Sequence, residues 1–148
     1  MQIVLYIHIL SATAWVGGSL LLFALGIFLR DKEAQNNVYK HLGPLYGYFE
    51  SVWLVSLLTT GTILYMHHGF SDIFVNAMDS DLAQTMIRKL IMVGFLALIT
   101  IIHMIIAFKT HTKTRTKLQN IISRGSSMMI FFLNFIILWH AIQIRSML

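Results

Sequence analysis

Histidines are the residues of this chain whose type and spacing are best suited to chemistry. His8 lies near the start of the first apolar segment and His140 near the end of the last, while His67 and His68 end the second. In a chain that crosses a membrane four times, all four residues lie at the same end of the helices. Imidazoles that meet at one depth from separate helices can hold a metal ion or the iron of a haem. We therefore expect a site formed by His8, His68 and His140, with His67 as a secondary candidate.

Two further ionisable residues lie together near the opposite end of the helices. Glu50 follows the start of the second apolar segment, and His103 precedes the end of the third. Ionisable groups within a membrane normally face the bundle interior, and a carboxyl and an imidazole at one depth are suited to proton transfer. We therefore predict that Glu50 and His103 handle protons. The alternative is that His103 belongs to a second haem or metal site.

Three basic residues lie on the same side of the membrane as the first group of histidines. Arg88 and Lys89 begin the third apolar segment, and Arg145 ends the fourth. That side should be depleted of positive charge, so these residues are unusual there. Cations at this position are suited to binding the propionates of a haem that is held edge-on in the bundle.

The helical face of His8 also carries Trp15 and Gly18, because successive residues of a helix turn by about 100°. We expect both residues to line the cofactor site. The structural alternatives are that His8 only hydrogen-bonds to a neighbouring helix, that Trp15 is a packing residue, and that Gly18 permits close helix approach.

Four helices are expected to position these residues. The chain has 148 residues, of which 57% are hydrophobic and 11% charged, and its mean hydropathy is +0.72. A membrane-spanning helix needs roughly 20 apolar residues. We predict spans over about 3–29, 45–66, 90–108 and 128–144, with Pro44 at the start of the second helix. The fold class is thus an all-α membrane protein, a single-domain antiparallel bundle of four transmembrane helices over residues 1–148.

The distribution of basic residues predicts the orientation of the chain. The net charge is +5, and most basic residues fall in the first and third connections, including the run HTKTRTK. Because cytoplasmic loops are enriched in Lys and Arg, both termini are expected outside, in a bacterial-type inner membrane. The basic run is interpreted as a topology signal and lipid-headgroup contact, so no nucleic-acid partner is expected. The absence of cysteine excludes disulfides and thiolate metal sites.

The spacing of His8, Trp15 and Gly17-Gly18 resembles the first helix of the CopD-type copper-resistance membrane proteins and of the related HemJ-type protoporphyrinogen oxidases. The resemblance to the HemJ type extends to chain length, helix number and a lysine followed by a histidine in the third helix, here Lys89 and His103. It implies a four-helix membrane protein that binds haem b and passes electrons from a porphyrinogen to the respiratory chain.

Two classes of function follow from these observations. The first is a haem b membrane oxidoreductase or electron carrier, linked to a quinone or a porphyrinogen, with a homo-oligomer or a redox subunit as a possible assembly. The second is a CopD-like copper-binding or transport protein. Its ligands would be the sequence MHH at 66–68 together with Met92, Met128 or Met129.

Overall fold

The computed structural model describes residues 1–109 and 116–148, apart from the side chains of residues 36, 39 and 120. Over this part of the chain the protein is helical and contains no strand. The helices, in chain order, are α1 (Gln2–Phe28), α2 (Lys32–His67), α3 (Phe70–Asn76), α4 (Asp81–Lys109) and α5 (Lys117–Met147). All except α3 are long and apolar enough to cross a membrane. The all-α class is therefore confirmed, and the four long helices are compatible with a multi-pass membrane protein.

Helix α2 begins well before the apolar segment that predicted it. Asp31 caps its N-terminus by accepting a hydrogen bond from the backbone N–H of Glu33, and the helix then runs through Pro44. The expectation that the second helix begins at Pro44 is thus wrong. The physical reason is that a local cap starts the helix in a polar stretch, whereas the apolar pattern detects only the part suited to lipid, Lys40–His67.

Helix α5 also begins earlier than its apolar segment. Thr116 forms a capping box at its N-terminus, so Lys117 and Arg124, which the sequence assigned to the third connection, lie within the helix. Lys113 and Arg115 of the basic run lie outside the described residues. The positive charge is therefore carried partly by a helix end.

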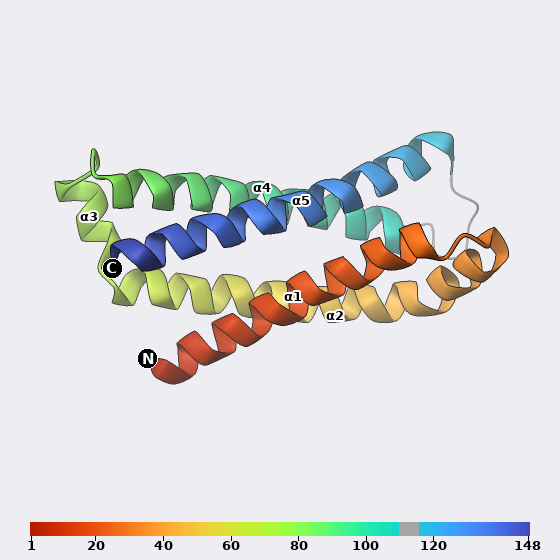
Figure 1. The fold of residues 1–148 in the computed structure, drawn as a ribbon, viewed down its shortest axis with the longest axis horizontal. Helices are drawn as coiled ribbons and strands as arrows, with labels where there is room; N and C mark the ends of the chain where they lie inside the picture. The colour runs from red at the N-terminus through yellow and green to blue at the C-terminus, as the bar shows by residue number, and fades with distance from the viewer. Residues whose placement is uncertain (110–115) are drawn as a thin grey trace.

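The four long helices pack in two pairs. Helix α1 packs along α2, and α4 packs along α5; further contacts of α1 with α5 and of α2 with α4 join the pairs. Figure 1 shows that the N-terminus, the C-terminus and the short helix α3 all lie at one end of the molecule. We call this end the outer end, and the opposite end, where α1 connects to α2, the inner end.

The interior of the bundle contains many polar residues, whereas large apolar side chains lie on its surface. The buried polar residues are Ser11, Ser19, Glu50, Thr60, Thr85, Thr100, Ser123, Ser126 and Asn134. Large aliphatic and aromatic side chains are exposed along all four long helices. In water such a surface would be an aggregation hazard, whereas in lipid it is the favourable arrangement. The central part of the interior is an apolar cluster of Trp15, Leu54, Leu96, Ile99 and Ile130.

Candidate functional site

The outer half of the α1–α2 interface contains His8. Its ring nitrogen Nδ1 lies 2.9 Å from the hydroxyl oxygen Oγ1 of Thr60. Thr60 donates its own hydroxyl proton to the backbone carbonyl of Ser56, at 2.6 Å, so it can only accept from the imidazole. Nδ1 of His8 therefore carries the proton, and in the neutral ring Nε2 carries the free lone pair.

A glycine of α2 leaves room for the ring of His8. A Cβ atom built on Gly61 would lie 3.2 Å from Cε1 of His8, which is closer than ordinary van der Waals contact. One turn further along α1, Ser11 is completely buried and its Oγ lies 2.8 Å from Oγ of Ser56. The orientation of His8 is thus set by two hydrogen-bonded contacts between α1 and α2 and by the missing side chain at Gly61.

Lys89 is the cation associated with His8. It is half-buried on α4, and its ammonium group lies close enough to His8 to act on it electrostatically. Among the described residues, no carboxylate forms an ion pair with Lys89. Arg88 and Arg145, in contrast, are exposed. Of the three predicted cations, Lys89 alone is half-buried and associated with the predicted ligand His8.

The remaining outer histidines make contacts within their own helices. Nδ1 of His68 lies 2.8 Å from the carbonyl of Leu64, and Nδ1 of His140 lies 3.0 Å from Oε1 of Gln143. His67 and His68 are both exposed, and their rings meet edge to face with centroids 5.5 Å apart. No described contact joins His8 to His68 or to His140. Within residues 1–109 and 116–148, no group of three or more His, Asp and Glu side chains could hold a metal ion.

The methionines named for the copper alternative are spread over the surface. Met66, Met128 and Met129 are exposed and Met92 is half-buried, on three different helices. No described contact gathers them near His67 or His68. A copper site of the MHH type therefore has no support from the positions of these residues.

The middle of the bundle contains a buried hydrogen bond that the sequence did not predict. Nε1 of Trp15 donates to Oδ1 of Asn134 across α1 and α5, at 3.0 Å. The amide nitrogen Nδ2 of Asn134 is buried and makes no hydrogen bond in the described structure. Asn134 interrupts an apolar run of α5, which is the signal that could have drawn attention to it. Trp15 is both a core residue and a donor.

Gly18 lies at a close contact between α1 and α2. A Cβ atom on Gly18 would lie 2.9 Å from Oη of Tyr46 and 3.4 Å from Cε1 of Phe49. Gly17, the adjacent residue, has open space around the corresponding position. Gly18 therefore contacts aromatic side chains of α2, as expected if the glycine permits close helix approach, the structural alternative considered above.

Glu50 and His103 lie at a similar depth in the inner half. The adjacent residues Ser51 and Met104 are in contact, with Oγ of Ser51 lying 3.7 Å from Sδ of Met104. Nδ1 of His103 lies 2.8 Å from Oγ of Ser126, whereas Glu50 is buried without a hydrogen bond to His103. The structure thus puts both residues at one level but assigns them different neighbours.

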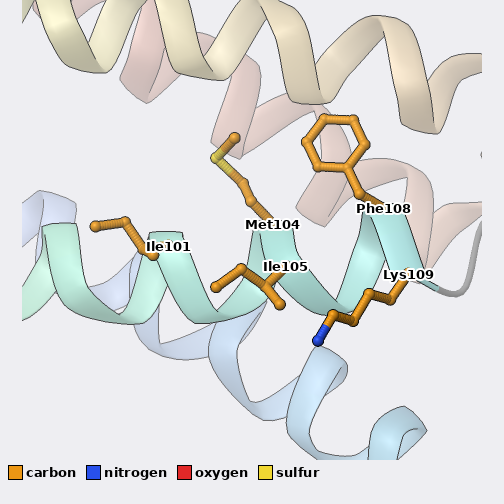
Figure 2. A pocket seen from close by; sticks show the side chains of 5 residues that line it. All are labelled: Ile101, Met104, Ile105, Phe108 and Lys109. Carbon is orange, nitrogen blue, oxygen red and sulfur yellow. The ribbon is translucent and has the colours of Figure 1, made fainter.

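Two apolar grooves lie on the surface of the bundle. The first, of about 350 Å³, is lined by Ile101, Met104, Ile105, Phe108 and Lys109 on α4. Figure 2 shows Met104 and Phe108 pointing toward α2, while the amino group of Lys109 points away from it. A second groove, along α5, is also apolar. Both grooves are open and suited to acyl chains.

Comparisons with family models, with curated proteins and with solved structures gave no match for this chain.

Proposed function

We propose that this protein is a haem b-binding membrane protein that transfers electrons, with His8 as an axial ligand. The observation that carries the proposal is the hydrogen bond of Nδ1 of His8 with Thr60, in a region that also contains the half-buried Lys89. Histidines that bind a metal commonly donate their other ring N–H to a protein group, which fixes the tautomer and the ring orientation. His8 has this arrangement, with Nε2 left for the iron.

The residues of the outer half fit such a group in three respects. His8 offers a lone pair whose direction is set by Thr60, Gly61 leaves the ring space, and Lys89 supplies a cation that no acidic side chain neutralises among the described residues. A propionate carboxylate of the haem would pair with the ammonium of Lys89 and neutralise its charge. The second axial ligand would be His140 or His68, whose Nδ1 atoms bond within their own helices and also leave Nε2.

A bound haem supplies one-electron exchange between the Fe(III) and Fe(II) states. In this proposal Thr60 keeps the proton on Nδ1 of His8 and thereby sets the basicity of the ligand. Lys89 binds the propionate and stabilises the more negative, reduced state. The electron partner would be a quinone or a porphyrinogen, and a redox subunit or a second copy of the chain would complete the path.

The antiparallel arrangement of the helices and the orientation of the chain in the membrane are part of the same proposal. Pairs of contacts support antiparallel packing, because His8 near the start of α1 contacts Thr60 near the end of α2, while Gly18 further along α1 contacts Tyr46 nearer the start of α2. We infer an antiparallel four-helix bundle whose outer end, with both termini, faces away from the cytoplasm in a bacterial-type inner membrane. The CopD-like and HemJ-like resemblance of His8, Trp15 and Gly17-Gly18 agrees with this arrangement.

The first experiment is the absorption spectrum of the purified protein. We expect a b-type spectrum in the dithionite-reduced minus oxidised difference, and His8→Ala should abolish or shift it. His67→Ala, at an exposed histidine of the same end, is the matched control and should leave the spectrum unchanged. A colourless wild-type protein that binds Cu(I) stoichiometrically would replace the haem proposal with the copper alternative.

The second experiment tests the roles of Thr60 and Lys89. Thr60→Val removes the hydroxyl at nearly constant volume, and we expect weaker haem retention or a shifted midpoint potential. Lys89→Met should lower the midpoint potential, because removing a cation favours the oxidised form, whereas Arg88→Met at the exposed neighbouring position should have a smaller effect. Equal effects of the two substitutions would contradict the assignment of Lys89 to the propionate.

A further inference from the structure

Glu50 is the only acidic residue in the interior of a candidate membrane span. The sequence contains six acidic residues, and the other five are exposed at helix ends or connections: Asp31, Glu33, Asp72, Asp79 and Asp81. Glu50, in contrast, is only 7% exposed. The function proposed above for the outer half makes no use of this carboxyl group.

Among the described residues, no Lys or Arg side chain forms an ion pair with Glu50. The phenol of Tyr46 is the hydrogen-bonding neighbour of the Glu50 carboxyl, although the two groups do not meet at standard geometry. On its own helix the nearest titratable group is the phenol of Tyr46, one turn earlier. Helix α1 brings Gly18 to this region, and α4 brings His103, whose Nδ1 bonds to Ser126 of α5. Lys89 belongs to the outer half.

Tyr46 provides a second, independent observation. Its hydroxyl is buried and makes no hydrogen bond of standard geometry in the described structure. The close approach of Gly18 holds the phenol in place, since a Cβ atom there would lie 2.9 Å from Oη. Buried hydroxyls normally have a partner, and the carboxyl of Glu50, one turn along the same helix, is the group that can supply one.

We propose that Glu50 is a proton-binding site that exchanges its proton with the inner side of the membrane, with Tyr46 as its positioning residue. An ionised carboxylate without a cation is very costly in an apolar environment, so the site holds its proton at rest. When the proton leaves, the phenol O–H of Tyr46 can donate to the carboxylate and stabilise the charge. The carboxyl O–H bond is the only covalent bond that breaks.

A proton fits this site better than a metal cation does. Hard cations such as Mg²⁺ and Ca²⁺ require six or more oxygen ligands, and the described surroundings of Glu50 offer its own carboxyl and the phenol of Tyr46. No cluster of acidic and histidine side chains accompanies it among the described residues. The polar side chains nearby are single hydroxyls that already donate within their own helices, as Ser51 does to Gly47.

The test is infrared spectroscopy of the full-length protein reconstituted in lipid vesicles at neutral pH. A protonated carboxyl absorbs at a higher wavenumber than an ionised carboxylate does, and its band shifts in D₂O. We expect Glu50→Gln to remove the carbonyl band of one protonated carboxyl per chain without loss of carboxylate absorption. Asp81→Asn, at an exposed acid, is the matched control and should remove carboxylate absorption only.

Three further measurements make the outcome of this experiment specific to Glu50. Raising the pH of the wild-type protein should convert the Glu50 band into carboxylate absorption, and adding Na⁺ at constant pH should not do so. Tyr46→Phe should retain the band and move its conversion to higher pH. Loss of only carboxylate absorption in Glu50→Gln, or conversion of the band by Na⁺, would overturn the proposal. Measuring His8→Ala separates this result from the haem proposal, because the Glu50 band should persist in that variant.

Discussion

Replacing Gly18 by alanine tests the close packing of α1 against α2. The added Cβ atom would lie 2.9 Å from Oη and 3.0 Å from Cε2 of Tyr46, and 3.4 Å from Cε1 of Phe49. The two rings are neighbours, with centroids 6.0 Å apart. We therefore expect Gly18→Ala to force the helices apart or to displace Tyr46.

The magnitude follows from two opposing effects. Overpacking by one methyl group costs about 1–3 kcal/mol in a packed interior. Alanine in place of glycine within a helix stabilises by up to about 1 kcal/mol. The net effect of Gly18→Ala should be a loss of up to about 2 kcal/mol. Gly17→Ala gains the same helix propensity without the clash, because nothing lies within 4 Å of the new atom, so it should be neutral or slightly stabilising.

The assay is unfolding of the two variants in mixed micelles of increasing SDS content, followed by tryptophan fluorescence and circular dichroism. Trp15 and Trp53 lie in or against the central apolar cluster and report on its packing. We expect the unfolding free energy of Gly18→Ala to fall below that of Gly17→Ala by about 1–3 kcal/mol, because the gain in helix propensity is common to both variants and only the cost of overpacking differs. Equal stability of the two variants would refute the packing described for α1 and α2.

Two other perturbations address the polar interior. Trp15→Phe should lower the unfolding free energy by about 1–3 kcal/mol, because it leaves Oδ1 of Asn134 unpaired beside the already unpaired Nδ2. In the same SDS titration, the double variant Trp15→Phe with Asn134→Leu should recover part of that loss. Recovery would be absent if the hydrogen bond contributed nothing. Gly61→Ala should displace the ring of His8 and weaken haem retention, measured as the ratio of haem to protein after gel filtration. Gly94→Ala is the control and should retain the wild-type ratio, because nothing lies within 4 Å of the added Cβ atom. Equal ratios would show that Gly61 does not position His8.

The helical class could be predicted from the sequence, because it depends on a property that is local along the chain. Apolar segment length identifies the helices, and the position within a segment gives the depth. The nearness of His8 and Lys89, and the common level of Glu50 and His103, follow from depth alone. The start of α2 was mispredicted because capping at Asp31, rather than hydropathy, determines where that helix begins.

The side-chain partners could not be predicted in the same way. Whether His8 turns to α2 or toward α5 depends on helix rotation and crossing, which hydropathy does not encode. Asn134, which interrupts an apolar segment, and Tyr46, which lies at the border of one, were not predicted from the sequence. Applying to Asn134 the argument used for Glu50, that a polar group within a span must face the interior, would have identified it. The partner of Asn134, Trp15, would still have required the structure.

The central apolar cluster determines which kinds of transfer the bundle can support. Its five side chains, around Trp15, are each less than a tenth exposed, and they separate the polar groups near His8 from those near Glu50. The polar link at this level is the bond from Trp15 to Asn134, and neither an indole N–H nor an amide can take up and release protons near neutral pH. This bond therefore does not relay protons between Glu50 and His8. If a haem is held at His8, as proposed above, electron transfer or a helix movement would be the means of coupling it to Glu50 through Trp15 and Asn134.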